Sequence, residues 1–241
     1  LVAVSYTALW HFWAQQVTAQ INIARADLTA QGTVIEGTIT PVTGFPGPLT
    51  LSFAGSLSST TQSLHIPSLT VRGFFLPGTK VHIDMPQGAR AQVPEWAEYS
   101  STLDALRLAA VVPSPLPASF TAGDLYHWQK SGGTLTVKEL HLRKGSLTVD
   151  GTGAIALDDR LQPVAQMPVV ITGHNNFLME LQSRQLVEPR QGLIAGAVLN
   201  GLSKPNDDGV PTLTLTLSIQ KSTLYAGPIR IMDVPPLFWP E

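Results

Sequence analysis

The chain has 241 residues, of which only 13% are charged, and its formal net charge is −2. An ordinary soluble domain carries about 25% charged residues, so this composition, with 20 glycines and 19 prolines, favours many short strands over long solvated helices. The small net charge and the lack of a Lys/Arg cluster exclude a nucleic acid partner. Without cysteine, the chain has no disulfide, thiolate metal site or cysteine nucleophile.

The first residues, 1–14, form a run that is apolar apart from small hydroxyls, Tyr6 and His11, and that contains no Asp, Glu, Lys or Arg. The run is shorter than the about 20 residues that a spanning helix needs. Because the chain opens on Leu instead of Met, we expect the run to be part of a membrane anchor. Tyr6, Trp10 and Trp13 match the aromatic belt at a membrane surface. The alternative is an amphipathic helix that covers a sheet, and a cleavable signal is disfavoured because no basic n-region is visible.

The helix is expected to continue beyond this run. Apolar residues recur at helical spacing up to Leu28. Gly32 can adopt the left-handed backbone conformation that commonly ends a helix. We therefore predict an anchor helix over residues 1–30, which includes an amphipathic extension. Residues 31–241 are expected to form a single β-rich domain with a helical insertion at about 175–203.

Alternation of apolar and polar residues predicts the strands in the first half of this domain. The pattern favours strands over residues 33–39, 49–53, 64–73 and 80–85. A change of phase at Pro67 and Ser68 predicts a β-bulge. Residues 87–99 match no pattern, and the run 103–112 fits a helix and a strand equally well.

Residues 133–171 read as three successive strands, with turns at Lys144 and Gly145 and at Asp158 and Asp159. In the first strand, the apolar residues move from odd to even positions near Lys138. The strand is therefore expected to change face there, either through a bulge or by passing to a second sheet.

The second of these strands places six residues on one face, and they are the candidate ligand groove. They are Leu147, Val149, Gly151, Gly153, Ile155 and Leu157. Glycines inside a strand permit sharp coiling of the sheet, or the close approach of another backbone or an acyl chain. The packing interpretation is the more common one for glycine within a strand.

The last third of the chain is expected to begin with two short helices that cover the sheet. Asn175 or Asn176 can cap the first of these helices, and Pro189 separates it from the second. Strict alternation over 212–219 predicts a strand, and residues 224–231 are expected to be its hairpin partner. An apolar extended tail over 234–240 follows.

Three segments carry a resemblance to a known family. They are VTGFP at 42–46, GSLTVDGTGAIALDDRLQP at 145–163 and STLYAGPIRIMDVPPLF at 222–238. Together with the aromatic N-terminal helix, they resemble the DUF2125 proteins of alphaproteobacteria. The resemblance implies an uncharacterised periplasmic protein on the inner membrane, with β-repeats similar to those of AsmA-type lipid-transport proteins. It implies no catalytic residue.

No motif indicates an enzyme, a cofactor or a metal site. The six histidines lie in separate segments without HExxH spacing, although His65, His82 and His141 fall on predicted strands. Phosphate-binding loops and nucleophile elbows are absent from the sequence. The carboxylates of Asp158 and Asp159 are expected to serve a turn, since adjacent strand residues point to opposite faces.

The expected fold is mainly β, a curled antiparallel sheet of hairpins that forms an open barrel or a sandwich, with an N-terminal helix and one or two covering helices. The function we expect is that of a periplasmic binding or scaffold protein at the inner membrane that holds a lipid in the curled sheet. The alternative is an accessory subunit of a membrane complex. The residues expected to contact a membrane or a partner lie at the apolar ends of the chain. They are Tyr6, Trp10, Trp13, Leu237, Phe238 and Trp239.

Overall fold

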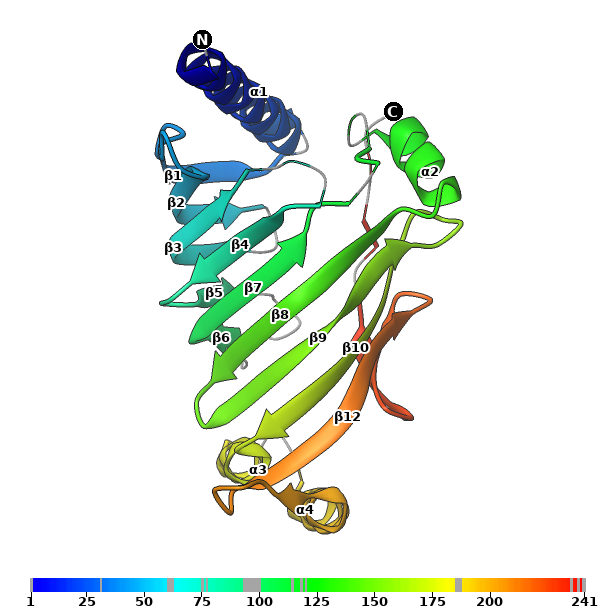
Figure 1. Ribbon diagram of the computed structural model, residues 1–241. Helices are drawn as coiled ribbons and strands as arrows, with labels where there is room; N and C mark the ends of the chain where they lie inside the picture. The colour runs from blue at the N-terminus through cyan, green and yellow to red at the C-terminus, as the bar shows by residue number, and fades with distance from the viewer. Residues whose placement is uncertain are drawn as a thin grey trace. The chain divides into compact units, whose positions relative to one another are not determined.

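The computed structural model describes most of the chain (Figure 1). The described residues are 2–30, 32–59, 63–74, 76, 78–92, 101–113, 115–117, 119, 121–184, 188–234, 236–237 and 239. The chain divides into two compact units, Leu1–Arg107 and Leu108–Glu241. The unassigned segment 87–99 lies mostly outside the described residues, apart from its first part.

The described residues are mainly β, as predicted. The strands form one large antiparallel sheet, which does not close into a barrel, and an N-terminal helix and a few short helices accompany it. The run 103–112, for which the sequence left two states open, is extended. Strand β7 (Ala105–Val111) occupies it and crosses the boundary between the two units.

The first unit combines one long helix with short and medium strands. The neighbours β1, β2, β3 and β4 are hydrogen-bonded in sequence order, and β5 pairs with both β3 and β6. The elements are α1 (Val2–Ala30), β1 (Val34–Ile39), β2 (Leu49–Ser58), β3 (Ser63–Gly73), β4 (Lys80–Met85), β5 (Ala89–Gln92) and β6 (Ser101–Leu103).

Two sequence predictions about the first unit are confirmed. Gly32 follows the end of α1 with a φ of 83°, a conformation that favours glycine. In the ladder between β2 and β3, Phe53 pairs with Leu69 whereas Gly55 pairs with Ile66. Two residues of β3, Pro67 and Ser68, therefore lie opposite one residue of β2, which is the expected bulge.

The second unit is built on long antiparallel strands. Their order is β8-β9-β10-β12-β13-β14, and β11 pairs with β12. Figure 1 shows β9, β10 and β12 as long, bent ribbons. The strands are β8 (Thr134–Lys144), β9 (Leu147–Leu157), β10 (Pro163–Thr172), β11 (Lys204–Pro205), β12 (Pro211–Gln220), β13 (Thr223–Ala226) and β14 (Ile229–Asp233).

The change of face in β8 takes place through a bulge. Val137 pairs with Gly153 and Leu140 pairs with Gly151, so the register shifts between them. Since β8 pairs with β9 on both sides of the shift, the strand does not pass to a second sheet. The segment 224–231 differs from the prediction of one strand, because a turn at Gly227 divides it into β13 and β14.

The described residues of the second unit include the helices α2 (Ala122–Lys130), α3 (His174–Ser183) and α4 (Pro189–Leu202). The sequence analysis missed α2, although Thr121 caps it by accepting a hydrogen bond from the Asp124 N–H. The predicted Asn cap of α3 is wrong. Gly173, with a φ of 72°, occupies the cap position, and no side chain caps this helix.

Candidate functional site

The strands of the second unit carry one almost wholly apolar surface, which we call the apolar face. Directly opposed residues of an antiparallel pair point to the same side of a sheet, so the register defines its rows. One row joins Leu142, Val149, Ile171 and Leu213 across β8, β9, β10 and β12, and the next joins Leu140, Gly151, Val169 and Leu215. The remaining members are Leu135, Val137, Leu147, Gly153, Ile155, Leu157, Ala165, Met167, Leu217 and Ile219.

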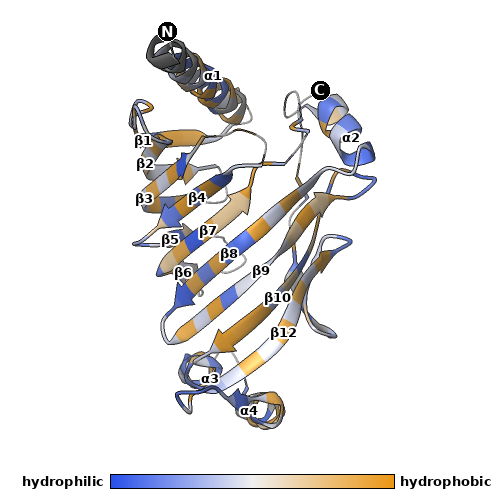
Figure 2. Cartoon of the chain, viewed as in Figure 1, coloured by the Kyte–Doolittle hydropathy of each residue, from blue (hydrophilic) through white to orange (hydrophobic). Residues whose placement is uncertain are grey.

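The opposite side of the same strands is largely polar. The His141 Nδ1 lies 2.6 Å from the Asp150 Oδ1, and the hydroxyls of Thr148 and Thr172 are hydrogen-bonded to each other. Along β12, the threonines alternate with the leucines of the apolar face. Figure 2 shows this alternation of hydrophobic and hydrophilic residues along the strands. The sheet therefore has two chemically distinct surfaces.

Much of the apolar face is accessible. Val137, Val149, Ala165, Val169 and Leu213 are buried. The other side chains of the face are only half-buried, among them those of Leu217 and Ile219. Large aliphatic residues are normally among the most buried in a protein. The face thus has a buried centre, and the residues around this centre are only partly covered. These residues can contact further apolar groups.

Neither Gly151 nor Gly153 leaves an open notch in this face. A Cβ at Gly151 would lie 2.7 Å from the Val169 Cγ1 and 2.8 Å from the Pro168 carbonyl oxygen. At Gly153 it would meet the Gln166 carbonyl oxygen and would lie 2.5 Å from the Met167 Cγ. All three distances are shorter than van der Waals contact. The glycines therefore serve the close packing of β9 against β10, which is the packing interpretation.

The six residues predicted for the groove all lie on β9, and the structure places them on the apolar face. Val149 is buried and the other five are half-buried. Sequence reasoning missed the residues that β10 and β12 contribute to the face, such as Met167, Val169 and Leu215. The alternation over 212–219 indicated that β12 has an apolar side, but only the register shows that this side joins β9 through β10.

Two aromatic residues of α1, Trp10 and Trp13, pack within the first unit. Trp10 is only 7% exposed, packs with Ala14 and Leu49, and donates an indole hydrogen bond of 2.9 Å to the Gly47 carbonyl. Its ring also contacts the Phe45 ring edge to face. Trp13 is half-buried beside this cluster. The Tyr6 side chain lies outside the described residues.

The structure has a helix, α1, where the sequence led us to expect a membrane anchor. No helix among the described residues is both long and apolar enough to cross a membrane.

The apolar tail at the other end of the chain is tied to the turn between β9 and β10. The Gln162 amide accepts from the Leu237 N–H at 2.8 Å and donates to the Leu237 carbonyl at 3.0 Å. The Trp239 indole donates to the Leu161 carbonyl at 2.8 Å. Leu237 remains 43% exposed and Trp239 is half-buried. Phe238 lies outside the described residues.

The same turn explains the carboxylates of Asp158 and Asp159. The Asp158 Oδ1 accepts hydrogen bonds from the backbone N–H groups of Arg160 and Gln162, which confirms its turn role. Asp159 lies 3.0 Å from the Lys130 ammonium of α2, and this hydrogen bond lowers the pKa of the Asp159 carboxyl. Both carboxylates therefore form contacts that stabilise the local structure.

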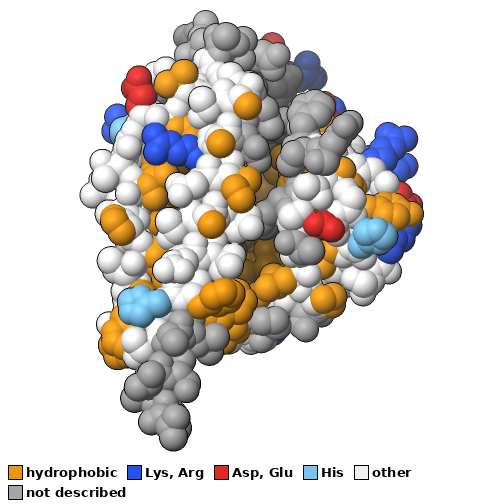
Figure 3. Space-filling view, turned by 90° about the horizontal axis from the view of Figure 1, so that it is seen from above, with side chains coloured by type: hydrophobic (Ala, Val, Ile, Leu, Met, Phe, Trp, Pro, Cys, Tyr) orange, Lys and Arg blue, Asp and Glu red, His pale blue; other side chains and the backbone are white. Residues whose placement is uncertain are grey.

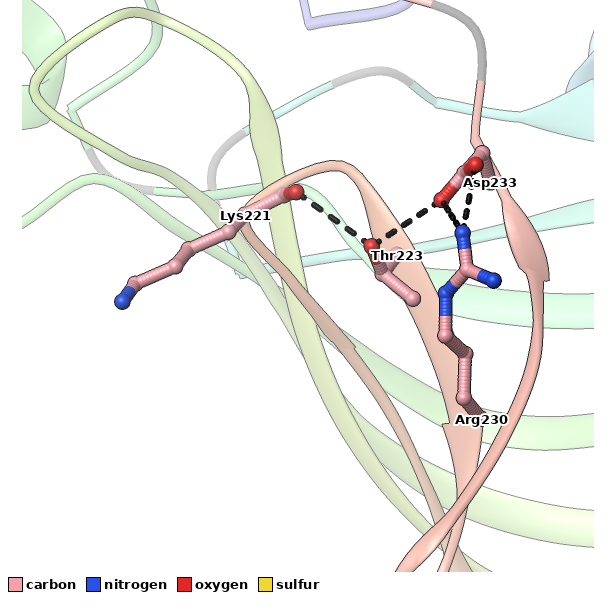
Figure 4. A network of polar contacts seen from close by, with 4 residues as sticks. All are labelled: Lys221, Thr223, Arg230 and Asp233. Carbon is pink, nitrogen blue, oxygen red and sulfur yellow. Dashed lines mark hydrogen bonds and ion pairs between the residues drawn. The ribbon is translucent and has the colours of Figure 1, made fainter.

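A second polar network closes the hairpin of β13 and β14 (Figure 4). The Thr223 hydroxyl lies 3.2 Å from the Asp233 Oδ1 and 3.5 Å from the Lys221 carbonyl oxygen. The Arg230 guanidinium donates to both oxygens of Asp233, and this contact holds the pKa of that carboxyl below its usual value. The network ties the two strands together, and the Asp233 carboxylate is engaged by both Arg230 and Thr223.

His174 is the one buried histidine in the described part of the chain. Its Nε2 lies 2.8 Å from the Ser203 hydroxyl, so it joins the beginning of α3 to the residue that follows α4. Burial lowers the pKa of His174. The pair lacks a carboxylate that would orient the imidazole for catalysis.

Charged side chains are sparse on the molecular surface. Figure 3 shows a few scattered Lys, Arg, Asp and Glu side chains among many uncharged ones. Among the described residues, no group of three or more His, Asp or Glu side chains could hold a metal ion. His65 instead lies 2.9 Å from the Ser56 hydroxyl, and His141 pairs with Asp150.

Comparison with known families matches residues 68–235 to the model of DUF2125, described as an uncharacterized protein conserved in bacteria. The chain belongs to the DUF2125 family. The match covers β4 to β14 and therefore includes every strand of the apolar face. No curated protein and no solved structure matches this DUF2125 protein.

Proposed function

We propose that this DUF2125 protein is a periplasmic binding protein, associated with the inner membrane, that holds a lipid chain or a similar apolar ligand on the apolar face. The observation that carries the proposal is the incomplete burial of that face. Leu215, Leu217 and Ile219 of β12 stay half-buried, although their strand lies in the middle of the second unit's sheet. A binding function without catalysis fits the polar networks, whose members serve turns and hairpins.

The chemistry of the face favours an elongated, uncharged ligand. None of its members is charged or carries a hydrogen-bonding side chain, so it offers no polar group to recognise a sugar or a nucleotide. The 11 residues of β9 span about 36 Å at about 3.3 Å per residue, a length that accommodates an extended acyl chain.

Apolar burial supplies enough free energy for such a complex. Each buried methylene gains about 0.8 kcal/mol, so a chain that buries about ten methylenes gains about 8 kcal/mol before the cost of association. The half-buried aliphatic side chains of β12 would lose their remaining contact with water in the same step. Both contributions favour a bound acyl chain.

Native mass spectrometry of the purified protein, followed by lipid extraction, tests this function. We expect a copurifying lipid, and we expect Leu217→Gln to reduce its amount because an amide then replaces an apolar contact. The matched control is Thr216→Gln on the opposite side of β12, which should keep the lipid. Wild-type protein that carries no lipid and binds no added fatty acid would contradict the proposal.

The second candidate function is an accessory subunit of a membrane complex. It is supported by Leu237, which the Gln162 amide holds in place while its side chain remains exposed. A purification in mild detergent would be compared with that of Leu237→Gln. If this function holds, we expect a partner to copurify with the wild-type protein and to be lost from Leu237→Gln. A protein without any partner would exclude it.

A further inference from the structure

Helix α4 has two sides of opposite character. Its packed side is made of small or polar residues. A Cβ at Gly192 would touch the Gln182 side chain of α3, and one at Gly196 would lie 3.5 Å from the Leu178 Cδ2. Asn200 accepts a hydrogen bond of 2.7 Å from Asn175 of α3. This side holds the helix in place.

The other side of α4 is aliphatic and faces solvent. Leu193 is 74% exposed, and Ile194 and Leu202 are each 60% exposed. Val198 lies between them at 47% exposure. The positions recur at the spacing of one helix face, and the 14 residues of α4 extend about 21 Å at about 1.5 Å per residue. We call these four residues the α4 stripe.

A basic residue stands at each end of the stripe. Residues 191–203 contain no charged side chain, Arg190 lies in the first turn of α4 and Lys204 is the second residue after the helix. Arg190 precedes Ile194 by one helical turn and so lies on the exposed side. Both side chains belong to exposed residues, and neither forms an ion pair with another described residue. The acidic residues nearest in sequence, Glu188 and Asp207, lie outside the helix.

From this arrangement we infer that α4 lies in the surface of an anionic lipid bilayer, with the α4 stripe among the acyl chains and Arg190 and Lys204 at the phosphates. An amphipathic helix of this kind buries its apolar side about 5–10 Å deep. Basic side chains near an anionic surface each add about 1 kcal/mol of attraction. The charges at the ends of the stripe therefore complement the headgroups, and the aliphatic side chains complement the hydrocarbon.

The composition of the stripe favours a lipid surface over a protein partner. The centres of protein interfaces are enriched in Trp, Tyr and Arg, whereas the stripe contains only Leu, Ile and Val. This inference does not depend on the apolar face being a ligand site. It places a membrane contact on the second unit, through α4.

A dye at a single cysteine reports on α4 itself. The chain has no cysteine, so Val198→Cys in the full chain gives one labelling site for an environment-sensitive NBD group. Vesicles of phosphatidylglycerol and phosphatidylethanolamine are then added. We expect a blue shift and a several-fold rise in NBD fluorescence at position 198. The matched control, Thr214→Cys on the polar side of β12, should show no change.

Further variants separate the contributions of the stripe and of the charges. Leu193→Gln combined with Leu202→Gln should remove the response at position 198, and both sites are exposed, so the fold should persist by circular dichroism. Arg190→Gln with Lys204→Gln should weaken it severalfold on these vesicles and leave the weaker response to pure phosphatidylcholine unchanged.

Three results would overturn the inference. The first is an unchanged NBD signal at position 198 on anionic vesicles, whether or not the protein binds them elsewhere. The second is a blue shift that rises with protein concentration in the absence of vesicles, which would show a second copy on the stripe. The third is a response that appears only with an added membrane protein.

Discussion

Trp10 of α1 and Leu193 of α4 are both large apolar side chains on helices, yet they lie in opposite environments. Trp10 of α1 is 7% exposed and hydrogen-bonded to Gly47 within its own unit. Leu193 of α4 is 74% exposed, because α4 packs through Gly192, Gly196 and Asn200 instead. The aromatic helix thus stabilises its own unit, whereas the aliphatic helix offers its side chains to another surface.

The difference shows that apolar composition alone does not identify a contact surface. An indole has a polar N–H that finds a partner when the ring is buried, and the loop of residues 42–48 supplies that partner. A leucine has no such group, so its environment depends only on the shape of its neighbours. The predictions below test this contrast, from the largest expected effect to the smallest.

The largest effect is expected from truncating the packed aromatic side chain. Trp10→Ala should reduce the free energy of unfolding by about 3–5 kcal/mol, because it opens a cavity and leaves the Gly47 carbonyl without its donor. Urea unfolding followed by circular dichroism measures this loss. Leu193→Ala on α4 is the control and should change stability by less than about 0.5 kcal/mol. Equal losses in the two variants would contradict the contrast.

The second prediction extends the contrast to the sheet. Gly153→Ala should destabilise the protein by about 1–3 kcal/mol, since the new Cβ would meet the backbone of β10 and the Met167 side chain. Thr152→Ala, at the exposed neighbouring position, provides the baseline in the same urea titration. A neutral Gly153→Ala would mean that the position has room for a side chain, and hence for part of a ligand.

The third prediction concerns the attachment of α4 to α3. His174 has a lowered pKa in the folded protein, so the unfolded chain binds its proton more readily. Stability is therefore fully present above the ordinary pKa of about 6.5 and falls as the pH drops below it. Urea unfolding at about pH 7.5 and about pH 5.5 should show this decrease. His174→Gln should flatten it, and an unaltered pH dependence in the variant would exclude His174 as its source.

The smallest effect is expected on the exposed side of α4. A Cβ added at Gly201 meets nothing within 4 Å, so Gly201→Ala should raise the melting temperature through the better helix propensity of alanine, which contributes up to about 1 kcal/mol. Gly192→Ala, on the packed side, is the matched comparison and should gain less or lose stability. A destabilising Gly201→Ala would show that this side of the helix is covered.

The sequence predicted much of this fold because local patterns determine strands and turns. Alternation located β3, β4, β8, β9 and β12, and the changes of phase near Pro67 and Lys138 marked real bulges. Short polar helices are harder to recognise, and α2 was missed despite its Thr121 cap. The apolar face could be predicted only on β9, since the contribution of β10 and β12 depends on pairing between distant segments.

The contact surfaces at the ends of the chain were predicted from composition, which does not report packing. The sequence gives no sign that Trp10 has a partner in the Gly47 carbonyl, or that the Gln162 amide holds Leu237, because each contact joins residues far apart in the chain. The exposure of Leu193 likewise follows from the way in which α4 packs on α3, which periodicity does not reveal.

Photo-crosslinking with a diazirine-labelled fatty acid tests the binding function of the apolar face most directly. The purified protein is irradiated with the probe, and the modified residues are located by mass spectrometry. We predict that the label concentrates on the apolar face, at residues such as Ile155, Met167 and Leu217, and that unlabelled lipid competes it away. Label that is absent, or that falls on the polar side of these strands at residues such as Thr214, would contradict the proposed function.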